Sequence, residues 1–413
     1  MQSQFDLSTA EVFKDDLLAM RVYTSQLLGR DQNLVLHGGG NTSVKIDDVL
    51  YVKGSGWNLD TIEKAGFSPV DLPTLIKMCD YETLSDTDMV SEQRAALKDN
   101  TAPNPSIEAI LHAIIPYTFV DHTHTDAVVT ISNTPQGKAK IAELYGPNML
   151  IIDYVMPGFI LAKTIQEATR GIDWSTLEGI ILLNHGVFTF DDDAQKSYEK
   201  MITIVDKAEQ FLATQANITT TQKSPCDFNI DELLQITSLI RGCDITPKVC
   251  QSAQAVHFST LSNLEEILYN GPLTPEHVIR TKPFPAIIED DIAQGLRLFN
   301  KRYENYFRQH KTSEVRLDLA PRYTVIKGYG FVALGKDEKE SQIIFDIVEH
   351  TIQAMLHTQK LGGWKSLSEA DIFDMEYWEL EQAKLGNVRK KGEKFKIKKT
   401  SQEDLTARIE AAR

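Results

Sequence analysis

The sequence predicts a mixed α/β protein in which a layered α/β domain is followed by a second, smaller α/β domain. Hydrophobic residues make up 42% of the 413 residues and charged residues 24%, as in folded globular proteins. Short β-branched runs alternate with helical patterns, which favours layered sheets and helices over a bundle or a sandwich. A polar, threonine-rich stretch at 216–227 interrupts this alternation and indicates a domain boundary.

These observations divide the chain into three parts. We expect a first domain at 1–220, an accessory α/β domain at 226–385 and a basic tail at 386–413. The run RKKGEKFKIKK in the tail is typical of a solvated, mobile segment, and binding to an anionic ligand or acidic surface is the alternative.

The first domain is expected to begin with a helix at 9–29, which has Ser8 and Thr9 as cap candidates and carries an apolar stripe. Short β runs punctuated by glycine follow at 33–46 and 48–56. The rest of this domain is expected to comprise a helix at 105–116, strands at 117–132, 149–158 and 179–190, and a helix at 193–214.

A partial internal repeat is one interpretation of the second domain. Residues 179–212 align without gaps with 322–355, and both show an apolar strand, a glycine turn, a second strand and an amphipathic helix. Residues 48–56 similarly resemble 277–285. The second copy has no histidine at the position that corresponds to His185. The second domain would therefore be a degenerate copy without metal chemistry. Two unrelated units with a common pattern are an equally good interpretation.

Composition excludes several classes of protein. The net charge of −15 argues against sequence-independent binding to nucleic acid, which depends on Lys and Arg. We expect no membrane-spanning segment, because no run approaches the ~18–20 apolar residues that a bilayer requires. The first residues do not resemble a signal peptide. The four cysteines show no CxxC spacing, so we expect a reduced, cytoplasmic protein without a disulfide framework.

Three histidines in the first domain are candidate metal ligands. His122 and His124 are two apart in an expected strand, so both imidazoles would point to one face. His185 lies where a β run meets a glycine turn, from which a side chain can be aimed into a cleft. Three neutral imidazoles with an open fourth position make a Lewis-acid zinc site. Taken alone, the pair could equally be one hydrogen-bonded and one solvated histidine.

Glu108 is a candidate acid/base, since it lies in the first turn of the helix expected at 105–116. A carboxylate beside a metal can move a proton next to a polarised carbonyl. Without the histidines, stabilisation of a helix N-terminus is the simpler role.

Two glycine-rich turns are candidates for anion binding. HGGGNTSVK (37–45) combines backbone freedom with hydroxyl and amide donors, but it lacks the spacing of a nucleotide P-loop. KGSGW (53–57) is a second such turn, and Ser106 adds a hydroxyl at a helix start. Structural turns are the alternative for both segments.

Together, the motifs HGGGNTS, PSxE, HxH and NHG resemble those of the class II aldolase/adducin family in order and approximate spacing, over about residues 10–215. Within it, HTHTDAV, TPEHVIRTK and FDMEYWELEQAKLG resemble the aldolase part of bifunctional rhamnulose-1-phosphate aldolase/alcohol dehydrogenase proteins. In those proteins a dehydrogenase domain follows. We expect it to be absent here, because KGYGFVALGK (327–336) misplaces the third glycine of GxGxxG.

The resemblance implies an α/β/α layered fold and a set of residue roles. His122, His124 and His185 would hold a divalent metal, with zinc the first choice, and Glu108 would be the acid/base. Tyr154 is a candidate for a further proton donor, with a core tyrosine as the alternative. The phosphate pocket would be lined by Gly40, Asn41, Thr42, Ser55, Gly56 and Ser106.

The implied activity is that of a class II, zinc-dependent aldehyde-lyase. It would reversibly cleave a ketose 1-phosphate of the rhamnulose or fuculose type to dihydroxyacetone phosphate and an aldehyde. A pentulose-phosphate 4-epimerase is the alternative enzyme, and a non-catalytic, adducin-like binding protein is the alternative from another class. The resemblance also implies a homo-oligomer, commonly a tetramer. For 226–385 we expect an oligomerisation or stabilising role, with a regulatory sugar-phosphate site at Arg280 and Lys282 as the alternative.

Overall fold

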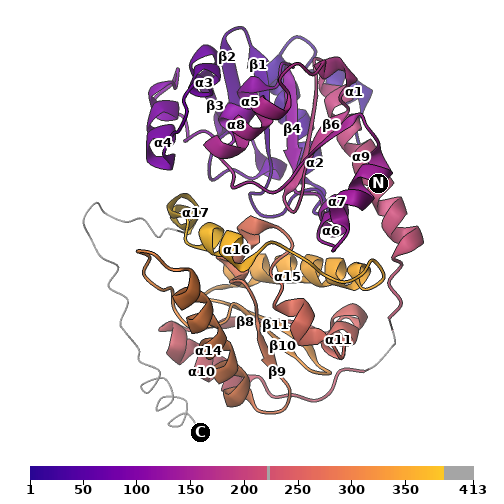
Figure 1. Ribbon diagram of the computed structural model, residues 1–413, viewed down its shortest axis with the longest axis vertical. Coiled ribbons are helices and arrows are strands. Elements are labelled where there is room, and N and C mark those ends of the chain that lie inside the picture. The colour runs from indigo at the N-terminus through magenta and orange to yellow at the C-terminus, as the bar shows by residue number, and fades with distance from the viewer. Residues whose placement is uncertain (221–223, 386–413) are drawn as a thin grey trace. The chain divides into compact units, whose positions relative to one another are not determined.

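The computed structural model describes residues 1–220 and 224–385, which form two compact units (Figure 1). Of the described residues, the first unit comprises 1–132 and 136–215, and the second comprises 133–135, 216–220 and 224–385. The basic tail expected at 386–413 lies outside the described residues. No helix of the described residues is long and apolar enough to cross a membrane.

The first unit is built on a seven-stranded sheet with the order β3-β2-β1-β4-β7-β6-β5, in which only β5 and β6 are parallel neighbours. Its strands are β1 (Asn41–Ile46), β2 (Val49–Lys53), β3 (Phe67–Asp71), β4 (Phe119–Thr123), β5 (Met149–Ile152), β6 (Gly179–Leu182) and β7 (Gly186–Asp191). Its helices are α1 (Leu7–Glu11), α2 (Leu17–Gly29), α3 (Leu72–Met78), α4 (Asp86–Ala95), α5 (Ala109–Ile114), α6 (Asp126–Ser132), α7 (Gly137–Tyr145), α8 (Phe159–Ala168) and α9 (Ala194–Gln215).

Helices cover both faces of this sheet, which confirms the predicted layered α/β/α class. The helices α2 and α9 pack on β1, β4 and β7, whereas α3, α5 and α8 pack together on the other face, where α5 and α8 lie in front of the strands in Figure 1. The central strand β4 sends alternate side chains to the two layers. Asp121 forms a fully buried ion pair with Arg21 of α2 at 2.5 Å, and the hydroxyl of Thr123 meets Met201 of α9. His122, between them, therefore points to the α5 face.

Several expected elements have different limits. The helix expected at 9–29 is split into α1 and α2, each capped by an aspartate: Asp6 accepts from Thr9 N at 2.7 Å and Asp16 from Ala19 N at 2.9 Å. The cap candidates Ser8 and Thr9 are therefore wrong. The β run at 33–46 becomes a strand only from Asn41.

The two apolar runs that flank the histidines also differ from the prediction. The strand expected at 117–132 ends at Thr123, and its second half is the helix α6. The β run at 179–190 is the hairpin β6–β7 rather than one strand. These differences place His124 just beyond a strand end and His185 in a turn, where both rings lie against the ring of His122.

The second unit contains a four-stranded sheet with the order β8-β11-β10-β9, with helices on both faces. Its strands are β8 (Thr246–Cys250), β9 (Ala286–Ile288), β10 (Tyr323–Ile326) and β11 (Gly330–Gly335). Its helices are α10 (Asp231–Arg241), α11 (Ala253–Ser259), α12 (Leu264–Leu268), α13 (Val278–Thr281), α14 (Ile292–His310), α15 (Glu338–Thr358), α16 (Glu369–Glu376) and α17 (Glu379–Lys384). An aromatic-rich core joins α10, α14 and α16 to one face of this sheet, while α11 and α15 pack on the other.

The proposed repeat corresponds in one part and fails in another. The hairpin β10–β11 followed by α15 has the same plan as β6–β7 followed by α9, and both hairpin turns hold a left-handed residue at the same position, Asn184 (φ 62°) and Gly328 (φ 74°). The second alignment is wrong, because 48–56 contains the strand β2 whereas 277–285 contains the helix α13.

A buried carboxyl group in the second unit gives a testable pH dependence. Glu376 is fully buried, its Oε1 accepts the Tyr303 hydroxyl proton at 2.8 Å, and burial raises its pKa to about 7. Between pH 4.5 and 7 the folded state therefore holds a proton that the unfolded state releases. This linkage lowers the free energy of unfolding as pH rises through that window, by up to about 3 kcal/mol.

Glu376→Gln keeps an acceptor for Tyr303 but cannot ionise. We expect urea unfolding to show that the variant gains about 3 kcal/mol over the wild type between pH 4.5 and 7.5. The exposed Glu338→Gln on α15 serves as the control and should leave the pH slope unchanged. Parallel pH profiles for wild type and Glu376→Gln would show that this carboxyl does not titrate in the window.

Candidate metal centre

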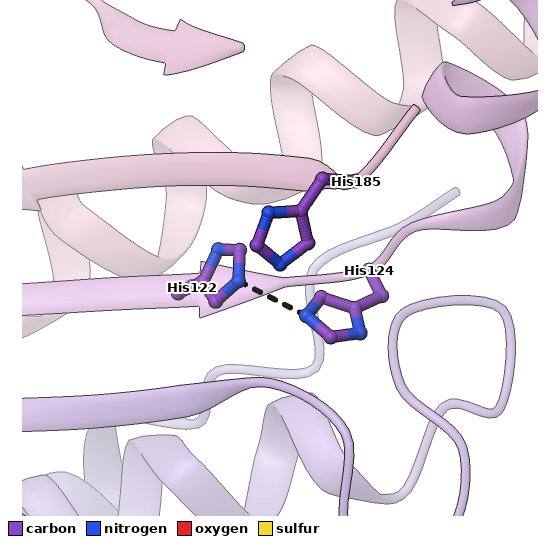
Figure 2. A group of neighbouring side chains, drawn as sticks. All are labelled: His122, His124 and His185. Atoms are coloured by element: carbon purple, nitrogen blue, oxygen red, sulfur yellow. Dashed lines mark hydrogen bonds between the residues drawn. The ribbon is translucent and has the colours of Figure 1, made fainter. Parts of the chain in front are cut away.

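The three candidate histidines converge in the first unit where the strand β4 ends and β6 turns into β7. His122 is in β4, His124 follows the end of this strand, and His185 is in the turn between β6 and β7. One nitrogen from each ring lies within 4.8 Å of the other two, and Figure 2 shows the rings turned toward a common centre. His122 and His185 are buried and His124 is partly buried. These three segments, remote in sequence, therefore bring together three ring nitrogens that could bind one metal ion.

Glycine makes this convergence possible. A Cβ atom on Gly186 would lie 2.3 Å from the carbonyl oxygen of Thr123 and 2.9 Å from Cε1 of His122, so any side chain there would push the strands or rings apart. Gly40 (φ 63°) approaches the carbonyl of His122 in the same way, since its Cβ would lie 2.7 Å from that oxygen. The glycines of the NHG and HGGGN motifs thus act as close-approach positions around the histidines.

The orientation of His122 is set by its neighbours. Its Nδ1 lies 3.0 Å from the carbonyl oxygen of Val187, which can only accept, so Nδ1 carries the proton and donates it. Its ring stacks on Phe188 with centroids 4.0 Å apart. Nε2 therefore presents its lone pair toward Nε2 of His124, 3.0 Å away. Two ring nitrogens that face each other at this distance fit a shared proton or a shared cation.

Glu108 completes the cluster from α5. It occupies the N-cap position, not the first turn as expected, and its side chain makes no capping hydrogen bond. Its Oε2 lies 3.5 Å from Nε2 of His122 and its Oε1 lies 3.8 Å from Nε2 of His185. The carboxylate is buried, and Oε1 has no hydrogen-bond partner among the described residues. A buried anionic oxygen beside three imidazoles fits a divalent cation, because burial without a counter-charge is costly.

Two residues that sequence reasoning did not single out complete the surroundings. His112 is fully buried on α5, four residues after Glu108, and its ring makes a T-shaped contact with that of Phe188, with centroids 5.5 Å apart. Burial holds the pKa of His112 well below its ordinary value, so this imidazole is neutral. Lys53, the last residue of β2, is also buried, and its Nζ donates to the carbonyl of Gly38 at 3.1 Å. The E-x-x-x-H spacing, which puts two side chains on one helix face, was the available signal for His112.

The glycine-rich turns lie next to the start of α5. Ser106 N donates to the carbonyl of Lys53 at 3.0 Å, and Ser55 N donates to that of Asn104 at 2.8 Å. Ser55 and Gly56 are exposed, and Ser106 is partly exposed with its Oγ accepting from Glu108 N. The hydrogen bond from Lys53 to Gly38 holds the loop that ends at Gly40 close to the same region. Backbone and hydroxyl donors therefore gather beside the carboxylate.

Other candidate residues are directed elsewhere. Asn41 uses its side chain within the protein, because its Nδ2 donates to Glu108 Oε2 at 2.6 Å. Thr42 lies one position along β1 and points to the opposite face, where its hydroxyl meets that of Ser25 at 2.8 Å. Tyr154 is partly buried in the connection between β5 and α8, and its hydroxyl lies 3.8 Å from Sδ of Met156.

Two family models match this chain. The model described as the class II aldolase and adducin N-terminal domain matches residues 20–212, and the one described as the aldolase class II second domain matches 236–385. YuxG of Bacillus subtilis, named an uncharacterized oxidoreductase, is 30% identical over 403 residues, which cover 88% of this chain and 57% of the relative. The chain thus spans little more than half the length of that curated relative.

Solved structures similar to the chain each cover about half of it. An N-terminal class II aldolase domain of a conserved Thermoplasma acidophilum protein is 37% identical and covers 51% of this chain and 99% of that one, with a TM-score of 0.47. L-fuculose-1-phosphate aldolase from Thermus thermophilus is 17% identical and covers 48% of this chain and 95% of that one, with a TM-score of 0.33. With a class II aldolase model matched in each of its two parts, the chain belongs to the class II aldolase/adducin family.

Proposed function

We propose that the first unit is a zinc-dependent aldehyde-lyase that reversibly cleaves a ketose 1-phosphate of the rhamnulose or fuculose type. The products would be dihydroxyacetone phosphate and an aldehyde. The observation that supports this proposal most is the convergence of His122, His124 and His185 beside the buried carboxylate of Glu108. An adducin-like binding protein would have no use for a complete ligand set.

The three imidazoles and Glu108 would have separate roles in the reaction. The three imidazoles would hold the cation, which when bound supplies a Lewis acid at the ketone oxygen of the substrate. Cleavage of the carbon–carbon bond leaves an electron pair on the dihydroxyacetone phosphate fragment as an enediolate. In the condensation direction the Glu108 carboxylate would remove a proton from that carbon. In the cleavage direction the substrate hydroxyl that becomes the aldehyde carbonyl must lose its proton, and Glu108, once protonated, would deliver a proton to the enediolate carbon.

The substrate phosphate would lie on the donors beside α5. We propose Gly40, Ser55, Gly56 and Ser106 for this role, with the nearby Lys53 supplying positive charge. Asn41 and Thr42 are not included, since their side chains are engaged with Glu108 and Ser25. Anchoring the phosphate would align the reacting carbons with the metal and with Glu108. We further propose a homo-oligomer, as the resemblance to class II aldolases implies.

The test is a metal assay followed by a substrate screen. We expect purified protein to contain zinc and to release dihydroxyacetone phosphate from rhamnulose, fuculose or ribulose 1-phosphate. EDTA should abolish the release, and added Zn²⁺ should restore it, because the cation carries the developing negative charge.

Three other outcomes would contradict the proposal in different ways. Activity that survives EDTA together with borohydride trapping of substrate would indicate a Schiff-base aldolase. Interconversion of pentulose phosphates without released aldehyde would indicate the 4-epimerase. Protein that binds no metal and turns over no sugar phosphate would indicate a binding protein.

A further inference from the structure

Two residues of β1 face two residues of α5 across a buried interface. Asn41 and Ser43 are two apart on the strand, which separates them by about 6.7 Å along it. Glu108 and His112 are four apart, which corresponds to about 6 Å along a helix. The two spacings match, so each strand residue lies opposite one helix residue. All four side chains are buried.

The four side chains form one continuous hydrogen-bonded chain. Oγ of Ser43 lies 2.8 Å from Nδ1 of His112. Nε2 of His112 makes a short hydrogen bond with Oδ1 of Asn41, and Nδ2 of Asn41 lies 2.6 Å from Oε2 of Glu108.

The donor and acceptor groups allow only one direction for this series of hydrogen bonds. An ionised carboxylate can only accept, so Asn41 must turn its amide NH₂ toward Glu108 and its oxygen toward His112. His112 must then donate from Nε2, and its Nδ1 accepts the Ser43 hydroxyl proton. This is the neutral Nε2–H tautomer, and burial of the imidazole keeps it neutral. Each donor in the chain is therefore matched to one acceptor.

We propose that Asn41 and His112 are positioning residues that hold the Glu108 carboxylate against His122 and His185, ready for proton transfer. The inference rests on the proposed function and deepens it. Glu108 makes no capping hydrogen bond that would restrain its side chain, and Asn41 supplies the side-chain hydrogen bond to its Oε2. His112 prevents the Asn41 amide from rotating, because a flipped amide would set its NH₂ group against the His112 Nε2–H and its oxygen against the Glu108 carboxylate. Asn41 thereby acts on the proton carrier.

His112→Phe and His112→Gln test this role in the full-length holoenzyme. Phenylalanine keeps an aromatic ring against Phe188 but removes both hydrogen bonds, whereas glutamine keeps an N–H donor for Asn41. The readouts are zinc content, kcat and KM for cleavage, and the rate at which the enzyme exchanges solvent deuterium into dihydroxyacetone phosphate alone. That exchange isolates the step in which Glu108 removes a carbon-bound proton and returns a deuteron.

We expect His112→Phe to lower kcat and the exchange rate together by about 10–100-fold, with zinc content and KM unchanged, because a misplaced acid/base loses rate without losing binding. His112→Gln should recover part of both rates. Thr189→Val is the matched control, since it removes a buried hydrogen bond to Ser197 on the opposite face of the same sheet and should leave both rates unchanged.

The outcomes separate this inference from the function on which it depends. Wild-type rates in His112→Phe, or a loss no larger than that of Thr189→Val, would overturn the positioning role while leaving the aldolase intact. Loss of zinc along with activity would identify a structural contribution to the metal site and overturn the inference as well. If the wild type itself neither cleaves sugar phosphates nor exchanges deuterium, the proposed function is wrong. The positioning role, which depends on that function, is then wrong as well.

Discussion

Glu108→Gln is expected to lower kcat by about 10²–10⁴-fold while the protein keeps its zinc, because a general acid/base contributes rate in this range. The amide has the shape of the carboxylate and can still accept from Nδ2 of Asn41, so local packing should be preserved. It cannot take up the substrate proton. Steady-state cleavage of the best substrate and zinc content of the same preparation measure the two effects separately.

The matched control is Glu167→Gln, which removes an exposed carboxylate from α8. It should leave kcat unchanged. Near-normal kcat in Glu108→Gln would exclude Glu108 as the proton carrier. Loss of zinc in that variant would give Glu108 a different role, as a fourth ligand of the metal.

The layered fold was predictable because the longest elements carry unambiguous patterns. The stretch 193–214 has helical periodicity and forms α9, which covers one face of the sheet. The stretch 126–132 was assigned wrongly for a physical reason. Its residues 127–132 are all buried in α6 and none of them is charged, so the sequence shows no solvent-exposed face that would distinguish a buried helix from a buried strand.

The candidate metal centre was predictable in its residue types but not in its geometry. His122, His124 and His185 could be chosen because imidazoles near glycine turns suit a metal. The directions of Asn41 and Thr42 could not, since neighbouring strand residues point to opposite faces and the sequence does not say which face holds the site. His112 was missed because a histidine in an apolar helix is commonly part of the core. Its spacing from Glu108 was a weak signal, and its contacts with Ser43 and Asn41 distinguish it from a core residue.

His122→Ala is expected to weaken zinc binding by more than about 100-fold and to abolish cleavage, since even residues that only orient a ligand cost 10–100-fold in affinity. The substitution removes a ring whose Nδ1 is held by Val187 and whose face lies on Phe188, and it leaves two imidazoles. Calorimetric titration of metal-free protein with Zn²⁺ measures the affinity directly, without any assumption about substrate.

A control with the same chemical change is His257→Ala on α11 of the second unit, which should bind zinc as the wild type does. Circular dichroism verifies that both variants are folded. Free imidazole should partly restore zinc binding to His122→Ala, because it can occupy the space beside Phe188 and supply the missing nitrogen.

The decisive comparison is among the three histidines. His122, His124 and His185 come from a strand, a strand end and a hairpin turn, and a shared ion would give the three rings a common function. Alanine at each position should therefore give the same loss of zinc and of cleavage, and a second substitution should add little to the first. Independent, additive losses would mean that the three rings do not bind one ion. The proposed reaction would then lack its Lewis acid.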